Sequence, residues 1–403
     1  MGAGGPRFES WYPDRESLND VSCLGFFLIF APTKSIIMSV KVKDVCRALE
    51  ELAPLALQES YDNAGLLCGD AEMEVKSALL AIDVTEDVVD EAISKGCNMI
   101  ISHHPLIFRG LKKITGKSYV ERCVIKAIKN DIAIYSSHTN LDKAVGGVSF
   151  KMAEKLGLKD VEVLCAEPEA LCQIVTFVPQ DYAEKVANAM FAAGGGCVGG
   201  YDGCSYRVEG VGTFRAGEGC NPFVGELGEM HYEKETRIEM VVREADAEKV
   251  RQAALSAHPY EEPVVDVYAL VQKSKTSGLG VVGILEKPMS EIDALKLIKE
   301  KFKCADVRFS PLLGREVRKI ALCGGSGAEF ITLAMSKGAD MYVTADCKYH
   351  EFFNAEGKIL VADIGHFESE QFTKEIFKAY LSEKIPNFVT YYSEVNTNPI
   401  NHL

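Results

Sequence analysis

The sequence predicts an α/β fold in two halves, each an α/β/α layer, with a smaller α+β module inserted between them. Three observations support this architecture. Apolar, strand-like runs alternate with amphipathic helical segments over residues 38–166 and again over residues 278–403. Residues 167–277 order their elements differently. The chain has 403 residues, more than one hydrophobic core usually supports, so several domains are expected.

Strand, helix and strand alternate in the first half. A helix is expected over VCRALEELAPLAL and a loop and strand over YDNAGLLCGD, residues 61–70. The strand VKSALLAIDV precedes a helix for which Thr85 is the expected N-cap and Gly96 lies past the end. The strand NMIISHHP, a helix over 117–130 and the strand DIAIYSSHTNLD follow, a pattern typical of a mostly parallel sheet.

The middle segment has the order of a ferredoxin-like module. Two rounds of strand, helix and strand are expected: CQIVTFVP, a helix over 182–193 and the glycine-rich GGGCVGGYDGCSYRVEGVGTF, then TRIEMVV, a helix over 246–257 and VVDVYALV. The polar flanks CAEPE and KSKTSG are expected to be linkers, which places the domain boundaries near residues 166 and 277.

The last part returns to the α/β pattern. Strands are expected over GLGVVGIL, VRKIALCGGSG, ADMYVTAD, KILVADIGH and NFVTYYSEV. Helices are expected over PMSEIDALKLIKEKF, with Ser290 as its N-cap, and over FESEQFTKEIFKAYLSEKI.

The composition excludes some classes of function. A formal net charge of −14 argues against binding of nucleic acid through the overall charge of the protein, because phosphate binding needs a basic face. Thirteen cysteines without a CxxC pair indicate thiols used as core residues in a reducing compartment, so a cytoplasmic protein is expected. Residues 1–37 are expected to be a disordered extension. Their apolar stretch, LGFFLIFAP, is too short for a bilayer, which needs about 20 apolar residues, and no membrane association is expected.

The pair His103 and His104 ends an apolar strand. Neighbouring strand residues point to opposite faces, so two histidines converge on one ligand only at a strand end or turn. Imidazole is the commonest side-chain ligand for transition metals, although a single buried histidine is more often structural. Asp142 follows the next strand, and ligands collect at the carboxyl ends of parallel strands.

A second pair, His366 and Glu370, lies four residues apart at a helix start and therefore shares one helix face. Three imidazoles and two carboxylates can hold two divalent ions, with one carboxylate bridging them. Zinc, iron, manganese and cobalt all remain open. Such a pair of ions could activate a water molecule against a phosphate or a carbonyl group.

Four other polar residues are candidates near this site. His138 is either a general acid or base beside the metals or a hydrogen-bonding loop residue. Asp346 and His350 are candidates for lining the same cavity, and Asn63 either touches substrate or serves a turn.

Three further motifs have competing interpretations. The run GGGCVGGYDGCS lacks the GK[ST] ending of a phosphate loop, which favours glycines for tight turns. The glycines of GGSG, residues 324–327, allow either a phosphate at a helix N-terminus or close packing. HPYEEP offers His258, Glu261 and Glu262, for which subunit contacts are favoured over a metal or small-ligand role.

Several motifs, among them ISHHPLIF, SSHTNLDKAVGGV, HPYEEPVVDVY, YVTADCKYHEF and DIGHFESEQ, resemble the NIF-three-like dinuclear-metal family. Its bacterial members include YbgI, and members are often labelled GTP cyclohydrolase I type 2. The resemblance covers residues 38–403. The sequence departs from the family pattern at Ala345, where TGD is common, and at Tyr61, where tryptophan is frequent.

The resemblance implies a toroidal homohexamer, a trimer of dimers, with dinuclear metal sites that face its interior. It also implies an inserted module like the copper-tolerance and PII signalling proteins. The family's metal ligands correspond to His103, His104, Asp142, His366 and Glu370.

Two hypotheses of function follow. The first is a divalent-metal-dependent hydrolase that acts on a nucleotide or related small substrate, with His138 handling protons. The second is a non-catalytic metal carrier, or a regulatory scaffold that binds protein partners. The cyclohydrolase label suits the first, but nothing in the sequence selects guanine.

Overall fold

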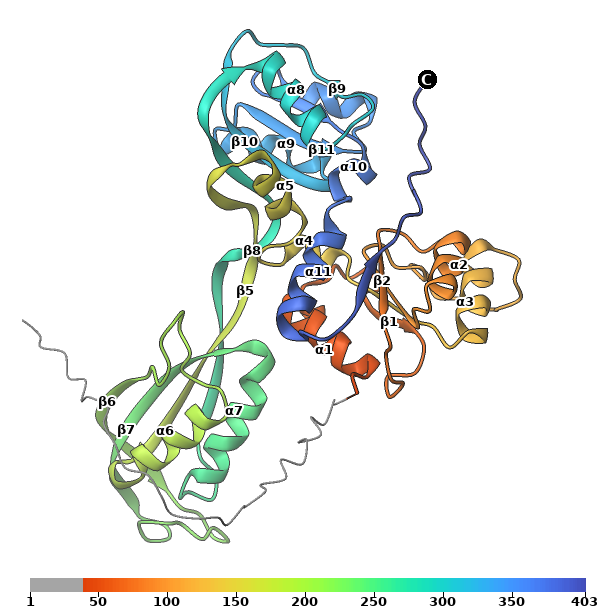
Figure 1. Ribbon diagram of the computed structural model, residues 1–403. Helices are drawn as coiled ribbons and strands as arrows, with labels where there is room; N and C mark the ends of the chain where they lie inside the picture. Colours follow the sequence, from red (N-terminus) through yellow and green to blue (C-terminus); the bar gives the residue numbers. More distant parts are fainter. Residues whose placement is uncertain (1–38) are drawn as a thin grey trace, which may run out of the picture. The chain divides into compact units, whose positions relative to one another are not determined.

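The computed structural model of the protein describes residues 39–403 (Figure 1). The expected extension, residues 1–37, lies outside the described residues. Within the part that is described, none of the helices is both long enough and apolar enough to cross a membrane.

The first sheet has five strands in the order β1-β4-β3-β2-β13. Their bounds are Gly65–Cys68 (β1), Ala78–Ala81 (β2), Met99–Ser102 (β3), Ala133–Ser136 (β4) and Thr390–Tyr392 (β13). Strands β4, β3, β2 and β13 are parallel, and β1 runs antiparallel to β4. The parallel arrangement predicted for the first half is therefore confirmed.

The second sheet has eight strands in the order β6-β7-β5-β8-β10-β11-β12-β9. Their bounds are Lys159–Pro179 (β5), Tyr206–Arg215 (β6), Met230–Arg243 (β7), Val265–Ser290 (β8), Arg308–Phe309 (β9), Glu316–Ser326 (β10), Met341–Ala345 (β11) and Leu360–Asp363 (β12). Strands β10, β11 and β12 are parallel, while the strands before β10 in the sheet pair antiparallel.

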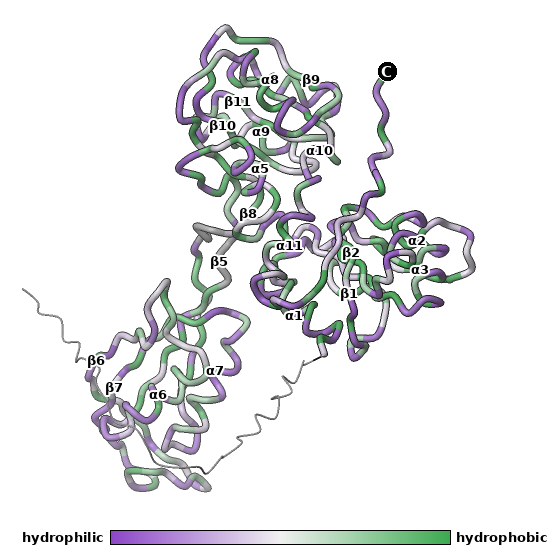
Figure 2. Tube along the Cα trace, in the orientation of Figure 1, coloured by the Kyte–Doolittle hydropathy of each residue, from purple (hydrophilic) through white to green (hydrophobic). Residues whose placement is uncertain are grey.

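Helices α2 and α3 are amphipathic, and hydrophilic and hydrophobic residues follow one another along both (Figure 2). The α-helices are α1 (Val42–Leu52), α2 (Glu86–Ser94), α3 (Tyr119–Lys129), α4 (Thr139–Lys143), α5 (Val148–Leu156), α6 (Ala183–Ala192), α7 (Glu244–Ala257), α8 (Glu291–Lys301), α9 (Ile331–Ser336), α10 (His366–Glu370) and α11 (Thr373–Lys384). Short 3-10 helices cover Leu55–Leu57 (η1), Gln180–Tyr182 (η2), Ala328–Phe330 (η3) and Tyr349–Ala355 (η4). The expected N-caps are confirmed, because the hydroxyl groups of Thr85 and Ser290 accept hydrogen bonds from the first turns of α2 and α8.

The two halves of the chain exchange elements. Helix α11, from the end of the chain, packs with α1 in the core of the first sheet, where Phe377 and Leu381 are fully buried, and strand β13 pairs with β2. Conversely, α5 from the first half packs with α8 against the second sheet through Met152. Helices α2 and α3 cover the other face of the first sheet. Each sheet therefore depends on residues from both ends of the sequence.

The middle segment has the order β5-α6-β6-β7-α7-β8, and α6 lies beside α7 (Figure 1). Both helices pack against the sheet through one apolar core. The expectation of linkers near residues 166 and 277 is wrong, because β5 and β8 remain paired there, with Ala166 opposite Gly278. Backbone hydrogen bonds between paired strands do not depend on side-chain hydropathy, so polar composition alone did not reveal the strands.

Candidate metal centre

A turn places the two adjacent histidines on the same side of the first sheet. Strand β3 ends at Ser102, and the backbone N–H groups of His103 and His104 both donate to the carbonyl of Ile82, at 3.1 and 2.9 Å. Their ring centroids are 5.0 Å apart. The strand alternation stops here, as the sequence predicted, so both imidazoles can approach one point.

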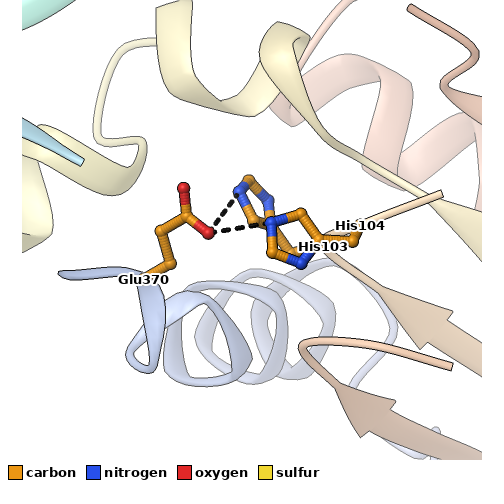
Figure 3. Close-up of side chains that lie close together, drawn as sticks. All are labelled: His103, His104 and Glu370. Carbon is orange, nitrogen blue, oxygen red and sulfur yellow. Dashed lines mark ion pairs between the residues drawn. The ribbon is translucent and has the colours of Figure 1, made fainter. Parts of the chain in front are cut away.

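The point that both imidazoles approach is the carboxylate of Glu370. Its Oε2 atom lies 2.9 Å from Nε2 of His104 and 3.6 Å from Nε2 of His103 (Figure 3). The carboxylate comes from the end of α10, and the histidines come from the end of β3. One ligand atom from each of the three residues falls within 4.8 Å of the others, so the group could hold a metal ion.

The other two predicted ligands lie at the same cluster. Nε2 of His366, the first residue of α10, is 3.2 Å from Oε2 of Glu370 and 3.2 Å from Nε2 of His104. Oδ1 of Asp142, in α4, is 3.7 Å from Nε2 of His103. All five predicted ligand residues are therefore brought together.

The chemistry of these atoms fits a bound cation. Nε2 of His103, Oδ1 of Asp142 and Oε2 of Glu370 are buried without a hydrogen-bond partner in the described part of the chain. Burying such atoms costs free energy unless they are paired, so orphans are rare in native structures. Three of them at one point are accounted for if a positive ion binds between them.

The other ring nitrogen of each histidine is held by a second group. Nδ1 of His103 lies 2.9 Å from the carbonyl of Ser137, and Nδ1 of His104 lies 2.7 Å from Oδ1 of Asp83. These acceptors keep a proton on Nδ1 and leave the Nε2 lone pair for a metal. Sequence reasoning did not identify Asp83. The available signal was an acidic residue shortly after the end of β2, at the same sheet edge as the histidines.

Asp346, predicted to line the cavity, contacts one of the predicted metal ligands. Its Oδ2 atom lies 2.7 Å from Nδ1 of His366. Its backbone φ of 56° is in the left-handed region, which aspartate tolerates better than most residues. Asp346 follows β11 and His366 follows the neighbouring β12, so the pair repeats in the second sheet the arrangement of Asp83 and His104 in the first.

The ionisable groups perturb one another strongly. Burial disfavours the charged form of His104, but its hydrogen bond with Asp83 and the negative charge of the nearby Glu370 carboxylate outweigh burial and raise its pKa to about 10. Burial also disfavours the charged form of His366, but its hydrogen bond with Asp346 and the negative charge of the nearby Glu370 carboxylate outweigh burial and raise its pKa to about 11. Despite its own burial, Glu370 has a pKa well below the ordinary value because the three imidazoles surround it. Without a metal, protons on His104 and His366 balance the charge of this carboxylate.

His138 stands beside the cluster as the N-cap residue of α4. Its ring centroid is 5.4 Å from that of His103 and 5.5 Å from that of His104. Its Nδ1 atom lies 2.7 Å from Oδ1 of Asp62. Burial opposes ionisation of Asp62, but hydrogen bonds from His138 and Thr139 outweigh it and lower the pKa of this carboxyl. Asp62 belongs to the motif YDNAG, yet sequence reasoning did not identify it.

Two weaker candidates lie elsewhere. The side-chain amide of Asn63 donates to the carbonyl of Ile107, so it ties its loop to the segment after the histidine pair. His350 is exposed on η4, where its ring contacts among the described residues are with Tyr349 and Phe353. A loop-stabilising role suits Asn63, and the structure does not bring His350 to the cluster.

The glycines of GGSG serve close packing. A Cβ atom on Gly325 would lie 2.4 Å from Oε1 of Glu370, and the φ of Gly325 is 63°. The N–H group of Gly325 also donates to the hydroxyl group of Ser369 at 2.9 Å. Of the two interpretations of this motif, the structure therefore favours close approach of the backbone to the metal ligands.

Two α/β halves that join a histidine and carboxylate cluster define this chain as an α/β protein with a candidate metal site. It belongs to the Duf34/NIF3 (NGG1p interacting factor 3) family, whose sequence model matches residues 40–399. The resemblance predicted from the motifs is thereby confirmed.

Similar proteins match along nearly their whole length. A GTP cyclohydrolase 1 type 2 homolog from Halalkalibacterium halodurans is 38% identical over 361 residues, 88% of this chain and 97% of that protein. One from Bacillus subtilis is 36% identical, covering 91% and 99%. The crystal structure of a Bacillus cereus protein related to NIF3 has a TM-score of 0.75 at 37% identity, covering 90% of this chain and 99% of that one. A Staphylococcus aureus protein of known structure has a TM-score of 0.78 at 30% identity, covering 91% and 99%.

Proposed function

We propose that this chain is a divalent-metal-dependent hydrolase that uses two ions per subunit and acts on a nucleotide or related small substrate. The observation that carries the proposal is the set of three buried, unpartnered ligand atoms on His103, Asp142 and Glu370. The names of the relatives from Halalkalibacterium halodurans and Bacillus subtilis support a nucleotide as the substrate class.

The cluster divides naturally into two ligand sets. His103 and Asp142 would hold one ion, and His104 and His366 would hold the other, with Glu370 shared because its Oε2 faces all three imidazoles. Nitrogen and carboxylate ligands suit zinc, iron, manganese or cobalt. When bound, a pair of ions supplies Lewis acidity and lowers the pKa of water toward about 7.

We assign proton transfer to His138. Its Nδ1 atom is committed to Asp62, so Nε2 is the nitrogen that can exchange a proton with a reacting group near His103 and His104. Asp62 orients the ring, as the carboxylate does in hydrolytic triads. In this assignment His138 contacts the reacting atoms, and Asp62 is a positioning residue.

The experiment that tests the proposal is a turnover assay of the full chain. The metal-free protein is reloaded separately with zinc, iron, manganese or cobalt and challenged with nucleoside triphosphates, including GTP, and with other phosphoesters. The proposal predicts hydrolysis that depends on one of the metals. Tight metal binding without turnover of any substrate would contradict it and favour a carrier or scaffold.

A matched pair of variants tests the role of His138. His138→Gln should lower kcat by about 10²-fold or more, the usual size of a general acid or base contribution, while bound metal is unchanged. Asp62→Asn should lower kcat less and alter its pH profile, since it acts through His138. His402→Gln, an exposed histidine paired with Asp306, is the control. Loss of metal from His138→Gln would mean that this residue is a ligand instead.

We also propose that residues 167–277 form a ferredoxin-like module and that the chain assembles into a toroidal hexamer, a trimer of dimers. The β-α-β-β-α-β order of the segment supports the first proposal. The family resemblance supports the second. Light scattering should then give six times the chain mass of 44.1 kDa, and a monomer would contradict the assembly.

A further inference from the structure

A cavity of about 620 Å³ lies in the inserted module, and the proposed hydrolytic site does not use it. Strands β6 and β7 line one side of it with residues such as Val208, Phe214 and Glu235. The loop that contains Phe223 and the HPYEEP segment that contains Tyr260 complete it. Its volume falls within the range of about 300–1,000 Å³ that is usual for small-molecule sites.

Aromatic rings line much of this cavity. The ring of Tyr260 lies edge-on to Phe214, with centroids 5.9 Å apart, and 6.3 Å from Phe223. Phe177 adds a fourth ring to the lining. Aromatic faces carry negative quadrupole charge and attract cations as well as apolar groups.

The charged residues of the lining are mostly acidic: Glu209, Glu235, Glu261, Glu262 and Arg237. Among the lining residues that the structure describes, Arg237 is the cation, and its Nε atom pairs at 2.7 Å with Glu239, outside the lining. The cavity therefore offers negative charge that its own arginine does not neutralise.

Glu235 is built into the wall of the cavity. Its exposed fraction is 8%, and its Oε1 atom accepts a hydrogen bond of 2.8 Å from the hydroxyl group of Tyr260. A Cβ atom on Gly212 would lie 2.1 Å from Oε2 of Glu235, so this carboxylate occupies space that only glycine leaves open. Burying a carboxylate beside a neutral phenol is costly, and a ligand cation would offset that cost.

The loop wall is held in place before any ligand arrives. The N–H group of Asn221 donates to Oε2 of Glu261 at 2.9 Å, which fastens the loop to HPYEEP. Phe223 packs edge-on against Tyr182, with centroids 5.4 Å apart. A preformed cavity loses less conformational entropy on binding, which favours affinity.

We propose that this cavity binds a small organic cation, a protonated amine or quaternary ammonium group carried on an apolar body. The cationic head lies at Glu235, and the body packs against the rings of Phe177, Phe214 and Phe223. Opposite charge at Glu235 and cation–π attraction distinguish this ligand from neutral and anionic molecules of the same shape.

The test uses the full chain and two probes of the same shape, phenethylamine and phenethyl alcohol, titrated by calorimetry at neutral pH. The amine should bind at least about tenfold more tightly than the alcohol, since each 1.4 kcal/mol corresponds to a factor of ten. Glu235→Gln should remove this preference and leave the affinity for the alcohol unchanged. Tyr260→Phe, which keeps the ring, should weaken amine binding less.

Glu248→Gln on α7 is the matched control, because Glu248 lies in the same module but pairs with Arg251 away from the lining. It should bind both probes like the unaltered chain. Equal affinity for amine and alcohol, an unchanged preference in Glu235→Gln, or failure of both probes to bind would overturn the proposal. Circular dichroism confirms that each variant is folded before titration.

Discussion

Oε2 of Glu370 lies 2.9 Å from Nε2 of His104, although one residue ends a helix near the C-terminus and the other follows the third strand of the chain. The exchange of α11, β13 and α5 between the two sheets holds these distant segments in register. The candidate centre therefore forms only when both halves are folded, and metal binding should stabilise the whole core.

Removing both neighbouring imidazoles should abolish metal binding without unfolding the chain. His103→Ala combined with His104→Ala takes away two ligands at a strand end and leaves the apolar strand β3 intact. Elemental analysis of the purified variant should find almost no bound metal, while circular dichroism remains unchanged. His402→Ala should keep its metal. Full metal content in the double variant would refute the assignment of these ligands.

Variants of the two carboxylates should differ in how much metal the protein retains. Asp142→Asn removes the acid that lies 3.7 Å from His103, so one ion should be lost and one kept. Glu370→Gln removes the carboxylate shared by all three imidazoles, so both should be lost. Elemental analysis of metal per chain distinguishes the two variants. Equal metal content in both would contradict a shared role for Glu370.

Gly325→Ala should damage the metal site more than the fold. The new Cβ would meet Oε1 of Glu370 at 2.4 Å, and the left-handed backbone adds about 1–2 kcal/mol of strain. Gly338→Ala is the matched control, since Gly338 has a φ of 71° and nothing within 4 Å of an added Cβ. Both variants should lose similar thermal stability without metal, but only Gly325→Ala should bind metal weakly. Equal metal affinity in the two would count against this contact.

Metal affinity should rise with pH. The raised pKa values of His104 and His366, about 10 and about 11, mean that both imidazoles keep their protons at neutral pH without metal. Each ion must displace those protons, so binding releases them and strengthens as pH increases. In the metal-free protein, these charged imidazoles contribute to the free energy of unfolding. Their contribution is fully present below a pH of about 6.5, the ordinary histidine pKa, and it is lost as the pH rises through the raised pKa values of about 10 and about 11.

Calorimetry in buffers of different ionisation enthalpy measures the protons released on metal binding. Net release at neutral pH, with affinity that grows toward higher pH, is the expected result. Affinity that is flat or falls with pH below about 10 would contradict the proton balance proposed for the cluster.

Features that depend on neighbouring residues in the chain could be predicted from the sequence. Two histidines at a strand end predict that both side chains point toward one site, because the alternation of side chains between the two faces stops where the strand ends. Thr85 predicts the start of a helix, because its hydroxyl group caps the first turn. Asp83 and Asp62 were missed because their partners, His104 and His138, lie far along the chain and no local pattern connects them.

Longer-range features also escaped prediction for physical reasons. The apolar stripe of α11 shows that Phe377 is buried, but periodicity does not say which sheet buries it. Likewise, a polar stretch such as residues 165–169 is compatible with either a linker or a paired strand. These residues form a strand because their backbone pairs with β8, and side-chain composition does not predict that pairing.

The most direct test of the central claim is anomalous X-ray diffraction from crystals of the metal-loaded protein. Two peaks about 3.5–4 Å apart are expected, with Glu370 between them, one beside His103 and Asp142 and the other beside His104 and His366. A single peak, or peaks away from Glu370, would contradict a two-ion centre built from these five residues.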